Sequence, residues 1–112
     1  HLERRLLAAA TAAGIPARIV AGGGPRCPQI STIAFVGLDR QALAMAADLA
    51  GVCLATGTAC ASGSSEPAPA LVAMGLPGEI VRGAVRFSLG RTTTPAEIDV
   101  AVERLSPLLR RP

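Results

Sequence analysis

The chain has 112 residues, the length of one ordinary domain; half are hydrophobic and only 2% are aromatic, so its core must be aliphatic. All eleven basic residues are arginines, and the formal net charge is +3. Without aromatic stacking platforms beside them, these scattered arginines do not favour nucleic-acid binding. The absence of lysine excludes any lysine Schiff base within this chain.

Membrane and metal chemistry are also disfavoured. No apolar run approaches the roughly 18 residues of a membrane span, and the first residues lack the uncharged stretch of a signal peptide, so we expect a soluble, cytoplasmic protein. The three cysteines, Cys27, Cys53 and Cys60, form no C-x-x-C pair, and His1 is the only histidine. We therefore expect free thiols and no metal site. The chain opens without methionine inside an expected helix, which suggests a fragment of a longer protein.

The first half of the chain predicts two helices and two strands. Apolar residues at the helical period predict a helix over 2–13, followed by a glycine and proline stop signal. A short strand within 17–25 and a second strand over 29–37 follow, with a glycine turn between them. Asp39 is placed to cap a helix over 40–50.

The second half predicts two more strands and two more helices. Residues 52–56 are apolar on both faces, which predicts a central strand with Cys53 as a small buried hydrophobe. Helical periodicity resumes after Pro67, and a fourth strand is predicted at 84–90. The last helix carries a capping box that begins at Thr94.

This order of elements predicts one small α/β domain over 1–112, of the two-layer α+β kind. We expect a mixed or antiparallel sheet of about four strands with helices on one face. The sequence contains no internal repeat and no linker.

Cys60 lies in a loop of small residues, 56–65, with the sequence TGTACASGSS. None of its neighbours is large enough to bury the sulfur, and the glycines loosen the backbone. Two interpretations stay open at this point: a mobile, exposed and functional thiol, or an incidental cysteine in a surface loop. Cys27 stands before a proline in a turn with no chemical partner nearby, and we interpret it as a bystander.

Two stretches carry a resemblance to a known family. The segment ATGTACASGSSEPAPALVAMGL, followed by AVRFSLGRTTTPAEID, resembles the small C-terminal domain of cysteine desulfurases of the NifS/IscS type. These are class V aminotransferase-family enzymes that depend on pyridoxal phosphate and have the type I fold. The likeness spans roughly 29–105, and the cysteine loop together with RFSLGR makes it specific.

The resemblance implies a sulfur transfer. Cys60 matches the family nucleophile, which takes sulfur from L-cysteine, leaves L-alanine and carries a persulfide to an acceptor. Arg86 matches the residue that holds the substrate carboxylate, a task that suits the planar guanidinium fork. Without the resemblance, an arginine paired with a glutamate on a strand surface would be the simpler interpretation. Arg91 stays undecided between a functional and a structural role, and Glu66 is expected only to start the helix after the loop.

The resemblance also implies components outside this chain. The lysine and other residues that bind pyridoxal phosphate belong to a large domain that this sequence lacks, so no cofactor-binding residue is expected here and the fragment alone is expected to be inactive. The implied partners are L-cysteine and a sulfur-acceptor protein, such as an iron-sulfur scaffold, or the machinery of tRNA thiolation; the full-length enzyme is expected to be a homodimer. Two alternatives stay open: another class V enzyme (an aminotransferase, an epimerase or a selenocysteine lyase), or a stand-alone persulfide carrier or partner-binding module.

Overall fold

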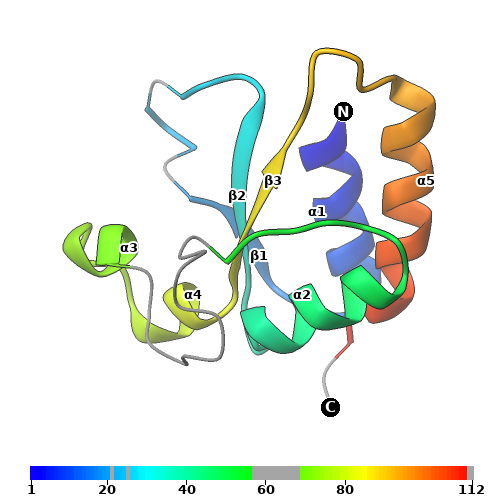
Figure 1. Cartoon of the computed structure of the whole chain (residues 1–112). Helices are drawn as coiled ribbons and strands as arrows, with labels where there is room; N and C mark the ends of the chain where they lie inside the picture. The colour runs from blue at the N-terminus through cyan, green and yellow to red at the C-terminus, as the bar shows by residue number, and fades with distance from the viewer. Residues whose placement is uncertain (21, 25, 57–68, 111–112) are drawn as a thin grey trace.

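The computed structural model describes residues 1–20, 22–24, 26–56 and 69–110 (Figure 1). In chain order the helices and strands are α1 (Leu2–Ala12), β1 (Ala17–Ile19), β2 (Ile30–Phe35), α2 (Arg40–Leu49), α3 (Pro69–Ala73), α4 (Gly78–Arg82), β3 (Ala84–Ser88), α5 (Pro95–Leu105) and the 3-10 turn η2 (Ser106–Leu108).

Within the described residues the sheet is antiparallel and has three strands in the order β1-β2-β3. Ala17 pairs with Phe35 at one side of β2, and Thr32 pairs with Arg86 at the other. The sequence analysis predicted a mixed or antiparallel sheet of about four strands. The described sheet has one strand fewer, and its central strand is β2 and not residues 52–56. That segment contributes a single bridge, between Ala55 and Arg86. Its continuous apolar run is typical of a central strand, yet here it runs along the edge of β3.

Both faces of the sheet are covered. On one face, the alternate residues Ile33 and Phe35 join the main core with buried side chains of α1, α2 and α5, among them Leu6 and Leu105. On the other face Ala34 joins a smaller cluster with Ile80 of α4. Figure 1 shows the three long helices on one side of the strands and α3 and α4 on the other. The prediction that the helices cover one face therefore holds for α1, α2 and α5 only. It is wrong for α4, which the sequence analysis did not predict.

The helix ends follow the predicted capping chemistry. Asp39 caps α2 by accepting a hydrogen bond from the backbone N–H of Gln41 at 2.9 Å. The Thr94 hydroxyl accepts from the backbone N–H of Glu97 at 3.2 Å and donates to its carboxylate at 3.2 Å. At the other end, α5 stops at Leu105 and the chain continues as a 3-10 turn that contains Pro107, whose ring is incompatible with a further α-helical turn.

Candidate functional site

Arg86 lies in the middle of β3, and its main chain is held by a segment outside the sheet. Its backbone N–H donates to the carbonyl of Ala55 at 2.7 Å, and its carbonyl accepts from the N–H of Ala55 at 3.2 Å. Its strand neighbours Val85 and Phe87 are buried in the main core. Because side chains alternate along a strand, Arg86 projects from the opposite face of the sheet.

The Arg86 side chain is exposed. Within the part of the chain that the structure describes, its guanidinium makes no ion pair; the ion pairs found there involve Arg5, Arg26 and His1. The alternative of a surface arginine paired with a glutamate is therefore not what the described residues show. No described carboxylate occupies the donors of this guanidinium, and a guanidinium binds an anion best through two parallel hydrogen bonds.

Cys60 and Glu66 fall in 57–68, outside the described residues, so their predicted roles stay predictions. The structure does place the two ends of this segment. Thr56 follows directly on the bridge to Arg86, and Pro69 begins α3. The chain thus enters the cysteine loop from beside the proposed carboxylate ligand.

The other two cysteines are both exposed free thiols. For Cys53 this contradicts the predicted burial, because residues 52–54 pair with no strand and leave the side chain outside the sheet. Cys27 does have a partner: its thiol donates to the Oε1 atom of Gln29 at 2.8 Å. Arg91 is exposed in the turn after β3, and its role stays undecided.

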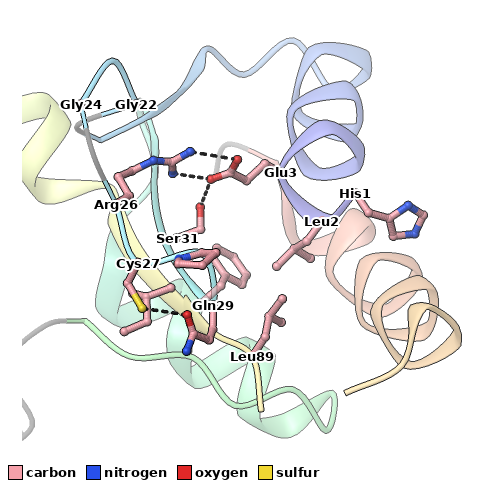
Figure 2. Close-up of a pocket in the computed structure, with 13 residues that line it drawn as sticks. His1, Leu2, Glu3, Gly22, Gly24, Arg26, Cys27, Gln29, Ser31 and Leu89 are labelled. Carbon is pink, nitrogen blue, oxygen red and sulfur yellow. Dashed lines mark hydrogen bonds and ion pairs between the residues drawn. The ribbon is translucent and has the colours of Figure 1, made fainter. Parts of the chain in front are cut away.

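A cavity of about 390 Å³ lies between the start of α1 and the turn before β2 (Figure 2). Arg26 donates to the Glu3 carboxylate at 2.6 Å, and Ser31 donates to the same carboxylate. These hydrogen bonds, that from Arg26 first, lower the pKa of Glu3 below its ordinary value of 4.5. Arg86 does not line this cavity. Sequence reasoning missed this network, because 23 and 28 residues separate Glu3 from its two partners.

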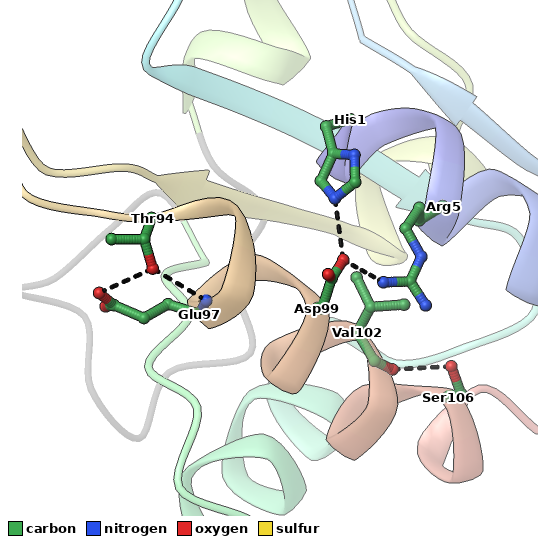
Figure 3. Close-up of polar contacts among 7 residues, drawn as sticks. All are labelled: His1, Arg5, Thr94, Glu97, Asp99, Val102 and Ser106. Atoms are coloured by element: carbon green, nitrogen blue, oxygen red, sulfur yellow. Dashed lines mark hydrogen bonds and ion pairs between the residues drawn. The ribbon is translucent and has the colours of Figure 1, made fainter.

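A second polar group joins the two helices α1 and α5 (Figure 3). Asp99 accepts from His1 Nε2 at 2.9 Å and from the guanidinium of Arg5. All three side chains are about half exposed, so the group ties the helices together at the surface and offers no enclosed site.

No helix in the described ranges is long and apolar enough to cross a membrane.

Comparison with known proteins gives the family. The model of the class-V aminotransferases matches residues 9–100. A cysteine desulfurase of Klebsiella pneumoniae is 40% identical over 99% of this chain and 27% of its own length. One of Cereibacter sphaeroides is 42% identical over 83% of this chain and 24% of its own. The chain therefore spans about a quarter of the length of these relatives.

Solved structures agree on the fold. A NifS-like protein superposes with a TM-score of 0.73 at 22% identity, over 96% of this chain and 26% of that one. The NifS-like protein of Rickettsia africae gives 0.69 at 25% identity, over 96% of this chain and 27% of its own. The protein belongs to the class-V aminotransferase family, and the predicted resemblance to NifS/IscS-type desulfurases is confirmed.

The family implies pyridoxal phosphate, but this chain does not fit it as a covalent anchor. The cofactor is held through a lysine amine, and none of the 112 residues is lysine. The side chains of this chain that could bind an anion or act as a nucleophile are its arginine guanidinium and cysteine thiol groups.

Proposed function

We propose that this chain is the small-domain part of a cysteine desulfurase, whose remaining residues hold pyridoxal phosphate. The exposed guanidinium of Arg86, which makes no ion pair with any described residue and lies beside Ala55, just before the cysteine loop, carries this proposal. The relatives named cysteine desulfurase, including the enzyme called IscS in Clostridium botulinum at 36% identity over 88% of this chain, support it.

In this proposal Arg86 binds the carboxylate of L-cysteine and Cys60 receives its sulfur. The balance is one cysteine and one Cys60 thiol giving one L-alanine and one Cys60 persulfide: the carbon–sulfur bond of the substrate breaks, a sulfur–sulfur bond forms, and the thiol protons are redistributed to the alanine methyl group and the persulfide. The pyridoxal phosphate supplies the electron-accepting chemistry from outside this chain. The persulfide then passes to an acceptor protein in iron-sulfur cluster assembly or tRNA thiolation.

The number of residues between Ala55 and Cys60 is compatible with these two roles. Five residues lead from Ala55, which is bonded to Arg86, to Cys60. An extended chain spans at most about 3.6 Å per residue, so Cys60 lies within about 18 Å of Ala55. This maximum span is long enough for the Cys60 thiol to reach a substrate held by Arg86.

The test uses the full-length protein loaded with pyridoxal phosphate and measures alanine and persulfide formed from L-cysteine. Arg86→Ala should lower kcat/KM roughly 30- to 800-fold, as expected for a lost charge-assisted contact. Arg86→Lys should recover only part, because an ammonium does not reproduce the fork. Cys60→Ser should abolish the persulfide, whereas the matched control Cys53→Ser should keep it. An active Cys60→Ser enzyme, or an Arg86→Ala enzyme with parental kcat/KM, would contradict the proposal.

A further inference from the structure

Thr32 is the cross-strand neighbour of Arg86 on the same face of the sheet. The main-chain groups of the two residues point away from each other: those of Arg86 bond to Ala55, and the carbonyl of Thr32 accepts from the N–H of Val20 at 2.9 Å. The two residues therefore form a non-hydrogen-bonded antiparallel pair. In such pairs the side chains come closest, with Cβ atoms about 4.5 to 5.5 Å apart.

The surroundings single out Thr32 on this face. Among the β2 residues that share the face with Arg86, Ile30 and Ala34 carry no polar atom in the side chain. The Thr32 side chain is half-buried, and its hydroxyl makes no hydrogen bond within the described residues. Among the residues that the structure describes, the Thr32 hydroxyl therefore has no hydrogen-bond partner, and the neighbouring Arg86 guanidinium forms no ion pair with a carboxylate.

We infer that the Thr32 hydroxyl is a second ligand for the substrate carboxylate and donates a hydrogen bond to it beside Arg86. The inference rests on the proposed function. A carboxylate has about four lone-pair sites, and a bidentate guanidinium uses two of them. The hydroxyl occupies a third and fixes the orientation of the carboxylate relative to the sheet. Without this contact the ligand would still be held by charge, but more weakly.

A competing role for Thr32 is to fill space, since β-branched residues pack well in strands. Thr32→Val keeps the branched shape and removes only the hydroxyl, whereas Thr32→Ser keeps the hydroxyl and removes the methyl group. These two variants separate the competing roles. Ser88→Ala is the matched control, because Ser88 lies on the same face two residues further along β3, opposite Ile30.

The experiment measures steady-state desulfuration of L-cysteine by the full-length, cofactor-loaded protein, with L-alanine as inhibitor. Thr32→Val should raise KM about tenfold and leave kcat within about twofold, as expected for one hydrogen bond to a charged group. It should raise the inhibition constant of L-alanine by the same factor, because alanine keeps the carboxylate and lacks the sulfur. Thr32→Ser should restore both constants, and Ser88→Ala should leave both unchanged.

The double variant tests whether Thr32 and Arg86 contact the same carboxylate. In an Arg86→Ala background, Thr32→Val should add less than its full tenfold effect, because both side chains contact one carboxylate. A Thr32→Val enzyme with parental KM, while Arg86→Ala weakens the use of cysteine, would overturn this inference and leave the proposed function standing. A raised KM that Thr32→Ser fails to restore would assign Thr32 to packing and would overturn it equally. An Arg86→Ala enzyme that is unaffected would instead overturn the proposed function.

Discussion

Gly83→Ala tests how closely the end of α4 approaches the sheet. Gly83 is buried and has φ −102° and ψ 8°, a conformation open to any residue. A Cβ atom added there would lie 2.2 Å from the carbonyl oxygen of Phe35 and 3.2 Å from that of Leu38. Glycine is therefore required here by the approach of two backbones and not by its dihedral angles.

The magnitude follows from that contact. The added carbon would lie more than 1 Å inside the 3.4 Å at which ordinary contacts begin. Phe35 cannot simply move away, because its side chain is fully buried and its N–H donates to the Gly83 carbonyl at 2.9 Å. Overpacking of this kind costs about 1 to 3 kcal/mol, and weakening the hydrogen bond adds about 1 kcal/mol. We expect a loss of about 2 to 4 kcal/mol in the free energy of unfolding.

The assay is urea unfolding followed by circular dichroism, with a thermal melt in parallel. The melting temperature should fall by roughly 10 to 20 °C for a domain of this size. The control is Gly78→Ala in the same helix, where the added carbon would meet only the end of the Arg82 side chain at 4.0 Å. It should change stability by no more than about 0.5 kcal/mol. Equal stability of Gly83→Ala and the parent, or equal losses in both variants, would refute the reasoning.

Three further predictions concern stability and reactivity. The folded state lowers the pKa of Glu3, so the parent should have a higher melting temperature than Glu3→Gln at pH values above 4.5. This difference in melting temperature should shrink as the pH falls below 4.5, and a difference that does not depend on pH would contradict the prediction. Thr94→Ala should cost about 1 kcal/mol in urea unfolding and Thr94→Ser much less, since only serine keeps the cap. Cys53 should react with a thiol reagent under native conditions, as measured by mass spectrometry, because its side chain is exposed; labelling only after unfolding would show it to be shielded.

The sequence predicted best those elements whose signals are local. Capping residues such as Asp39 and Thr94 act within three residues of themselves, so the starts of α2 and α5 were predicted correctly. The periodicity of β2 was equally local, with alternate residues entering different clusters. The short helix α4 carries little periodicity in five residues, and the sequence analysis assigned no element to it.

The errors came from features decided by distant parts of the chain. An apolar run of five residues predicts a buried strand but does not indicate which strands it pairs with. Only the folded structure shows that 52–56 makes a single bridge and that Cys53 is exposed. The network of Glu3 has the same origin, since its partners come from a turn far along the chain. For the site, the family motif identified Arg86, but its bridge to Ala55 and its pairing with Thr32 depend on register, which the sequence does not state.

That register gives the proposed site its physical basis. Antiparallel pairing alternates the direction of main-chain bonding, so a residue bonded outward to Ala55 must present its side chain close to that of its partner on β2. Arg86 is such a residue, and its neighbours across the strand edges are therefore Ala55 on one side and Thr32 on the other. A register shift of one residue would turn Arg86 toward the main core and place Phe87 on the outer face. The burial of Val85 and Phe87 opposes such a shift, so the same apolar side chains that stabilise the domain also keep the Arg86 side chain exposed on the opposite face of the sheet.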